Sequence, residues 1–93
     1  MTEQEIRDRV ATMPGWRLAE GGLRKEYKFP DFGGAMRFMA AAAAGIETLN
    51  HHPEWTNVYN RVSVHLTTHD AGGVTAKDFE LAGVLDAAAR KHS

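Results

Sequence analysis

The sequence predicts an α+β domain whose elements follow the order αββαββα, with a four-stranded antiparallel sheet and three helices packed on one face of it. Two observations lead to this prediction. Three segments repeat apolar residues at helical spacing, and two pairs of segments alternate apolar and polar residues around short turns. At 93 residues the chain can bury one core, so a single domain over residues 1–93 is expected. Helices on one face of a sheet are an economical way to bury such elements.

A capping box begins the first helix. Thr2 and Glu5 have the spacing at which side chains and backbone exchange hydrogen bonds at a helix N-terminus. Apolar residues follow at helical intervals, so a helix is predicted over residues 3–12. Pro14 and Gly15 end this helix.

A first hairpin follows. Residues 16–18 and 23–29 are predicted strands, and the turn falls at residues 20–22, which contain two adjacent glycines. The second strand mostly alternates between apolar and polar residues. Lys25 is its exception, because the alternation places Lys25 on the apolar face.

A long helix is predicted over residues 31–50, with Asp31 as its N-cap and Asn50 at its end. Residues 40–44 are five consecutive alanines, which propagate a helix well and allow another helix to approach closely. This alanine segment is expected to pack against the sheet, to form a helix–helix contact between subunits, or to do both on opposite faces.

A second hairpin joins residues 54–59 to residues 62–68 through a turn at Asn60 and Arg61. The second of these strands alternates strictly, so one face is predicted to be core and the other polar. Continued alternation places His69 on the polar face. That face is expected to stay open for a ligand or a partner.

Composition excludes several functional classes. The formal net charge of −1 argues against a dedicated nucleic-acid binder, and the absence of cysteine excludes disulfides and thiolate metal sites. No apolar run approaches the roughly 20 residues that span a bilayer, and the N-terminus lacks a basic-then-apolar signal pattern. A cytoplasmic protein without a membrane partner is therefore expected.

Three of the five histidines lie in two short segments, at His51, His52 and His69. Such a cluster indicates proton transfer or metal ligation, because histidine titrates near neutrality and its ring nitrogens bind metals. Convergence of the three on a zinc ion is one alternative, and capping of the preceding helix by His51 and His52 is another. His65 and His92 are interpreted as structural residues.

Three further residues are candidates for the same site. Glu47 precedes His51 by one helical turn and is expected to orient its imidazole. A last helix is predicted to start at residues 75–78 with a capping arrangement, and residues 81, 82, 85, 88 and 89 form its apolar stripe. Asp78 also falls on this stripe, where a carboxylate needs a partner. It either caps its own helix through Thr75 or contacts a ligand or a histidine. Trp55 offers a flat apolar wall beside the histidine pair, or is ordinary core.

These segments resemble the pterin-4a-carbinolamine dehydratases over nearly the whole chain, in order and with matching spacing. The matching residues are Glu47-xxx-His51-His52-Pro53-Glu54-Trp55-x-Asn57-Val58-Tyr59-Asn60-x-Val62, then Leu66-x-Thr68-His69-Asp70, then Gly73-Val74-Thr75-xx-Asp78, together with Gly15-Trp16 and Phe29-x-Asp31-Phe32. One position departs from the family, because the residue before the histidine pair is often Asp there and is Asn50 here.

The resemblance implies the αββαββα fold and loss of water from the 4a-hydroxytetrahydropterin left by aromatic amino acid hydroxylases, giving quinonoid dihydropterin. It implies His51, His52 and His69 as the catalytic residues. Supporting pocket residues would be Glu47, Trp55 and Asp78. No metal and no organic cofactor is implied.

The resemblance also implies an alternative function of another class. Family members in animals serve as a dimerisation cofactor for a homeodomain transcription factor, so a non-catalytic role in pterin binding or dimerisation is the second hypothesis. A homodimer or homotetramer is expected, because a free sheet edge can pair with another copy. A functional link to an aromatic amino acid hydroxylase is the further partner that the resemblance suggests.

Overall fold

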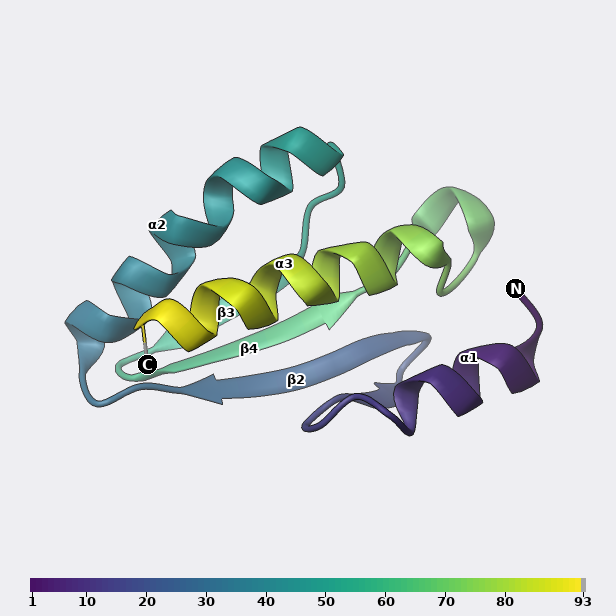
Figure 1. Ribbon diagram of the computed structural model, residues 1–93, viewed down its shortest axis with the longest axis horizontal. Coiled ribbons are helices and arrows are strands. Elements are labelled where there is room, and N and C mark those ends of the chain that lie inside the picture. The colour runs from purple at the N-terminus through teal and green to yellow at the C-terminus, as the bar shows by residue number, and fades with distance from the viewer. Residues whose placement is uncertain (93) are drawn as a thin grey trace.

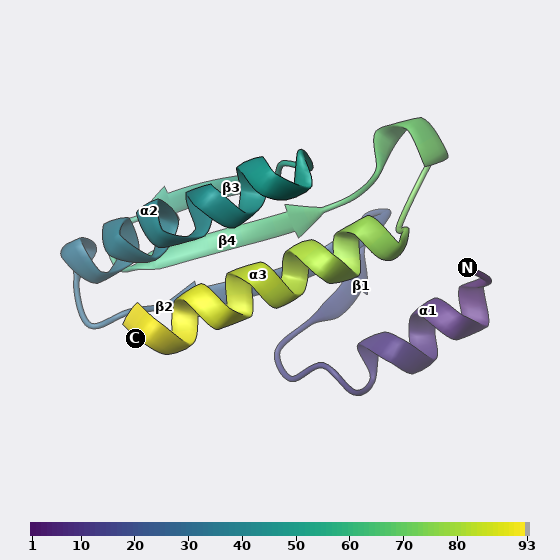
Figure 2. The same ribbon diagram turned by 45° about the horizontal axis from the view of Figure 1, so that its top comes forward.

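The computed structural model describes residues 1–92 and confirms the predicted α+β class and element order. The elements are α1 (Glu3–Val10), β1 (Arg17–Ala19), β2 (Gly22–Lys28), α2 (Phe32–Leu49), β3 (Glu54–Val58), β4 (Arg61–Leu66), the 3₁₀ turn η1 (His69–Ala71) and α3 (Ala76–His92). Helices α2 and α3 lie side by side across one face of the sheet, and α1 lies beside its β1 end (Figures 1 and 2). No helix among residues 1–92 is both long and apolar enough to cross a membrane.

The four strands form one antiparallel sheet in the order β1-β2-β4-β3, so β2 and β4 are central. Their register pairs Leu23 with Leu66 and Tyr27 with Val62. Apolar side chains of β2 and β4 therefore share the face that α2 and α3 cover. The polar residues of β4 lie on the opposite, open face, as the strict alternation predicts.

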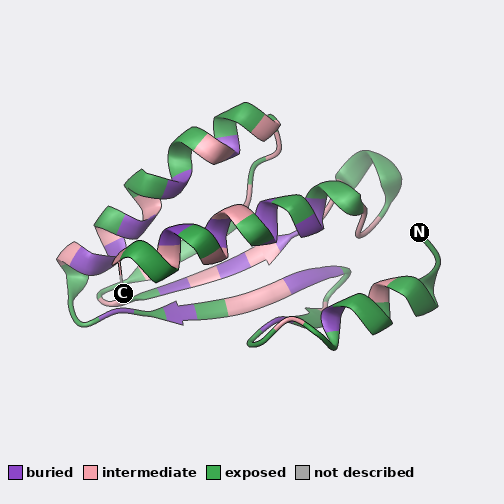
Figure 3. Ribbon diagram, in the orientation of Figure 1, coloured by how far each residue is buried: buried purple, intermediate pink, exposed green. Residues whose placement is uncertain are grey.

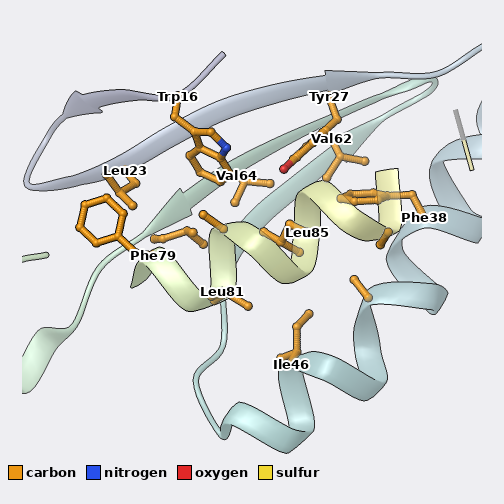
Figure 4. Packing of buried hydrophobic residues seen from close by; sticks show 14 of the residues in the cluster. Trp16, Leu23, Tyr27, Phe38, Ile46, Val62, Val64, Phe79, Leu81 and Leu85 are labelled. Atoms are coloured by element: carbon orange, nitrogen blue, oxygen red, sulfur yellow. The ribbon is translucent and has the colours of Figure 1, made fainter. Parts of the chain in front are cut away.

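The core fills the layer between the sheet and the two long helices, as Figure 4 shows. Val62 and Val64 of β4 and Leu85 of α3 meet in this layer, and each is at most 2% exposed. Phe38 of α2 closes one end of the layer, with its ring centroid 4.7 Å from that of Tyr27. This core holds α3 against the sheet and so fixes the position of the N-terminus of α3.

The predicted helix caps are present. The Thr2 side chain accepts from the Glu5 N–H and the Thr2 N–H donates to Glu5 Oε1, which completes the capping box. Helix α1 ends at Val10, two residues before the predicted end. Asp31 caps α2 by accepting from the Gly34 N–H. These caps satisfy backbone donors that a helix start leaves free.

The alanine segment of α2 is divided between core and solvent. Ala42 is fully buried, whereas residues 40, 41, 43 and 44 are exposed. Figure 3 shows exposed residues along the outer side of this helix. The next residue, Gly45, lies where α2 and α3 approach closely. A Cβ added there would come 2.5 Å from Val84 Cγ1. Core packing of this segment is thus confirmed for Ala42, and a subunit contact through the exposed alanines stays a prediction.

A partner on α3 explains why Lys25 lies on the apolar face. Its Nζ lies 2.8 Å from Asp86 Oδ1, and Tyr27 and Trp16 also donate hydrogen bonds to this carboxylate. Burial alone raises the pKa of Asp86. The hydrogen bonds and the Lys25 charge outweigh burial, so the pKa lies below its ordinary value. Burial, followed by the bond to Asp86, raises the pKa of the Tyr27 phenol.

The second hairpin departs from prediction at both ends of β4. The turn falls at Tyr59 and Asn60, one residue earlier than predicted, because Tyr59 adopts a left-handed conformation with φ of 52°. Asn57 stabilises this turn by donating to the carbonyls on either side of Asn60. Strand β4 ends at Leu66, and His69 lies in η1, so a strand reaching residue 68 was wrong. The cause is a short loop closed by an isolated bridge between residues 68 and 73.

Candidate active site

Three segments that are distant in sequence meet at one end of the sheet. They are the α2–β3 loop with His51 and His52, the segment after β4 with Thr68 and His69, and the first turn of α3 with Asp78. Direct contacts of Asp78 with His51 and Thr68 join the three segments. The antiparallel pairing of β3 with β4 places the start of β3 next to the end of β4, which brings the two loops together.

Asp78 is the buried centre of this arrangement. It is fully buried, and its Oδ1 lies 2.6 Å from Nε2 of His51, whose side chain is 14% exposed. Its Oδ2 accepts from Thr68 Oγ1 at 2.8 Å and from the Thr75 N–H at 2.9 Å. Both alternatives for Asp78 therefore hold, since it caps α3 through Thr75 and also contacts a histidine. A buried carboxylate persists when its oxygens are paired in this way.

The hydrogen bonds around Asp78 assign the tautomer of His51. Oδ2 of Asp78 already accepts from Thr68 and Thr75, and an ionised carboxylate only accepts. The bond to Oδ1 is then donated by Nε2–H of His51. In the neutral ring the lone pair lies on Nδ1. Asp78 thus fixes both the orientation of His51 and the nitrogen that is able to take up a proton.

Glu47 pairs with His52, which corrects the expectation that it orients His51. Its Oε1 lies 3.1 Å from Nε2 of His52, and both side chains are more than half exposed. The reason is the end of α2. Asn50 adopts a left-handed conformation with φ of 50°, so the chain leaves the helical path before His51. His51 therefore lies against α3 and is no longer one helical turn away from Glu47. His52 is the histidine that contacts Glu47 instead.

His69 pairs with Glu54, which is not among the site residues predicted from the sequence. Its Nε2 lies 3.0 Å from Oε1 of Glu54, and Oε2 of Glu54 lies 3.7 Å from Nδ1 of His65. Glu54 and His65 are directly opposite each other in the β3–β4 register. A signal was present in the sequence, because Glu54 starts the strand that pairs with the one carrying His65.

Trp55 lies at the margin of the core. It is opposite Val64 on the helix-covered face of the sheet, and its ring centroid is 6.2 Å from that of Phe38. The residue is half-buried. Packing against the core accounts for this contact, and a role for Trp55 as a wall of the site stays a prediction.

The described residues do not form the ligand set that the zinc alternative requires. Among the described residues 1–92, no three His, Cys, Asp or Glu side chains are grouped so that they could hold a metal ion. Instead, each of the three candidate histidines presents Nε2 to its own carboxylate, on Asp78, Glu47 or Glu54. Paired imidazoles with a second nitrogen available are suited to move protons near neutral pH.

The fold and these contacts define a small α+β protein with a cluster of histidine–carboxylate pairs at one end of its sheet. Residues 1–88 match the model of the pterin 4 alpha carbinolamine dehydratase family, and the chain belongs to this family. A protein of Solibacter usitatus whose name assigns it provisionally to the same family is 54% identical over 89 residues, covering 96% of this chain and 94% of its own. A relative from Prochlorococcus marinus with the same name is 46% identical over 87 residues, or 94% of this chain and 91% of its own.

Solved structures are similar as well. The crystal structure of a transcriptional coactivator/pterin dehydratase from Brucella melitensis superposes with a TM-score of 0.89 at 43% identity, covering 96% of this chain and 97% of that one. A pterin dehydratase-like protein identified as a RuBisCO assembly factor in the alpha-carboxysome has a TM-score of 0.69 at 22% identity. The second likeness concerns the fold alone.

Proposed function

We propose that the protein removes water from a 4a-hydroxytetrahydropterin to give quinonoid dihydropterin. The observation that carries the proposal is that His51, His52 and His69 each present Nε2 to a carboxylate at the same end of the sheet. Membership of the family supports the substrate class. Recycling of tetrahydropterin for an aromatic amino acid hydroxylase is the setting in which such a reaction is useful.

The reaction consists of two proton transfers. An acid protonates the 4a-hydroxyl as its C–O bond breaks, and a base takes the proton from the adjacent ring nitrogen, whose electron pair forms the C=N bond. One proton leaves nitrogen, one reaches oxygen, and water departs. Each positioned acid or base contributes about 10²–10⁴-fold to the rate. Two histidines in opposite protonation states are able to supply both groups.

His51 is the proposed base. Because Asp78 accepts the Nε2 proton, the lone pair of the neutral ring lies on Nδ1, where a substrate proton is received. The carboxylate also stabilises the positive charge that the ring then gains, as the aspartate of a Ser-His-Asp triad does. His52 or His69 supplies the acid. Glu47 holds His52, and Trp55 flanks the bound ring.

Stopped-flow absorbance of freshly generated 4a-hydroxytetrahydropterin tests the proposal. The wild-type protein is expected to accelerate its decay over the spontaneous reaction. Comparison of His52→Ala with His69→Ala assigns the acid, because the variant that lacks it loses about 10²–10⁴-fold in rate. Absence of acceleration by the folded wild-type protein would contradict the proposal.

A non-catalytic role in binding or dimerisation is the second candidate. The exposed alanines 40, 41, 43 and 44 of α2 have small side chains that would let another helix approach closely, and the Brucella melitensis relative is described as a coactivator as well as a dehydratase. A homodimer or homotetramer through this surface is expected. Light scattering tests this subunit contact, because Ala43→Arg should form an assembly of lower molecular mass than the wild type. An unchanged mass would exclude this surface.

A further inference from the structure

A row of three contacting side chains connects the open face of the sheet with the candidate site. His65 on β4, Glu54 on β3 and His69 in η1 follow one another, with Glu54 between the two histidines. Oε1 of Glu54 contacts Nε2 of His69 at 3.0 Å, and Oε2 lies 3.7 Å from Nδ1 of His65. The two oxygens of one carboxylate therefore face two different imidazoles.

His65, the most buried residue of this row, is held firmly. The His65 side chain is 13% exposed and lies directly over Gly22, where any Cβ would overlap its Nε2. Nε2 of His65 has no hydrogen-bond partner within the part of the chain that the structure describes. The neutral ring with its proton on Nδ1 leaves no donor unpaired there, and this proton faces Glu54. His65 thus gives Glu54 a fixed neighbour.

His69, the most exposed residue of this row, has few contacts besides the one with Glu54. The His69 side chain is 79% exposed, and it belongs to a three-residue 3₁₀ turn. An exposed imidazole samples several rotamers and both neutral tautomers unless a partner selects one. The hydrogen bond that His69 Nε2–H donates to Glu54 Oε1 is the contact that makes this selection.

We infer that Glu54 is a positioning residue, which holds His69 by Nε2 and leaves Nδ1 as the nitrogen that meets the reacting group. The effect of Glu54 on turnover rests on the proposed dehydratase function. Its effect on the orientation and tautomer of the His69 ring does not, because both are properties of the free protein. The Glu54 side chain is itself 55% exposed, so the pair contributes little to stability and can be removed without unfolding the protein.

Glu54→Gln is the appropriate variant, because it keeps the length of the side chain and removes the charge. A glutamine amide both donates and accepts, so it no longer selects one tautomer of His69. Glu26→Gln is the matched control. It removes the same charge from the same open face, where Glu26 contacts Ser63 and not a histidine.

Long-range ¹H–¹⁵N spectra of the histidine rings, recorded on the full chain, test the positioning directly. At a pH where the ring is neutral, His69 is expected as the Nε2–H tautomer in the wild type and in Glu26→Gln. A mixture of tautomers is expected in Glu54→Gln. Identical His69 signals in Glu54→Gln and the wild type would overturn the inference, whether or not the protein proves to be a dehydratase.

Stopped-flow kinetics add the functional readout. Glu54→Gln is expected to lower kcat by on the order of tenfold while KM changes little, because the carboxylate holds a catalytic group rather than the substrate. An unchanged kcat in a variant whose His69 tautomer has shifted would overturn the catalytic part of the inference. Inactive wild-type protein would instead refute the proposed function, and the ring spectra would still decide the positioning.

Discussion

Nε2 of His51 lies 2.6 Å from Oδ1 of Asp78, and this contact joins the loop after α2 to the first turn of α3. The two residues are 27 positions apart in the sequence. Asp78 is at once a helix cap and the partner of a candidate catalytic base, since Thr75 and His51 use different oxygens of the same carboxylate. Changes at Asp78 should therefore affect stability and turnover together.

Asp78→Asn tests this double role. The amide keeps the shape of the side chain but places an N–H₂ group among donors, so a buried donor is left without an acceptor. We expect a loss of about 1–3 kcal/mol in the free energy of unfolding. We also expect a fall in kcat of about 10²–10⁴-fold, because the tautomer of His51 is no longer fixed. Asp70→Asn, an exposed carboxylate in η1, is the control. Normal turnover in Asp78→Asn would refute the role of Asp78 in orienting His51.

Glu47→Gln tests the exposed pair of Glu47 with His52 separately from the buried pair of Asp78 with His51. Because Glu47 and His52 are 77% and 59% exposed, their contact should contribute at most about 1 kcal/mol to stability. Urea unfolding should accordingly give nearly the same midpoint for the variant and the wild type. A large loss of stability would mean that Glu47 makes a structural contact beyond its pair with His52.

Asp86 gives the protein a specific dependence on acid. Its folded-state pKa lies below the ordinary value of 3.8, so the stability that it contributes is present above about pH 3.8 and is lost as the pH falls from there through the folded-state pKa. Asp86→Asn should be less stable at neutral pH and should lose less stability on acidification. Circular dichroism during urea unfolding at a series of pH values measures both. Asp8→Asn on the exposed side of α1 is the control, and an equal acid slope in Asp86→Asn would contradict the prediction.

The approach of α2 to α3 at Gly45 predicts opposite effects for two glycines. Gly45→Ala should destabilise the protein by about 1–3 kcal/mol, because the new Cβ would meet Val84 Cγ1 at 2.5 Å. Gly83→Ala in α3 meets nothing within 4 Å and should stabilise by about 0.5–1 kcal/mol through helix propensity. Thermal unfolding of the two variants compares them. Val84→Ala should restore part of the loss in Gly45→Ala, and equal effects of both glycine changes would refute the close approach.

The elements that could be predicted from sequence are those with local causes. Thr2 and Asp31 cap helices through residues three positions away, and the alternation of β4 follows from burial of one face. The shift of the second turn was not predictable in the same way. It depends on the left-handed conformation of Tyr59, a residue type that rarely signals such a turn.

The site shows the same division between local and long-range causes. The spacing of Glu47 and His51 suggested a pair, but Asn50 turns the chain away from the helix and His52 becomes the partner. The contact of His51 with Asp78 depends on how α3 docks on the sheet, which no local pattern contains. Residue identity therefore indicated the site, and tertiary packing decided its pairs.

The decay of 4a-hydroxytetrahydropterin in the presence of wild-type protein and of His51→Ala tests both the dehydratase function and the role of His51 as its base. The wild type should accelerate the decay, and His51→Ala should lose about 10²–10⁴-fold of that rate with its circular dichroism spectrum unchanged. Full activity in folded His51→Ala would contradict the assignment of His51 as the base, and no acceleration by the wild type would contradict the dehydratase function itself.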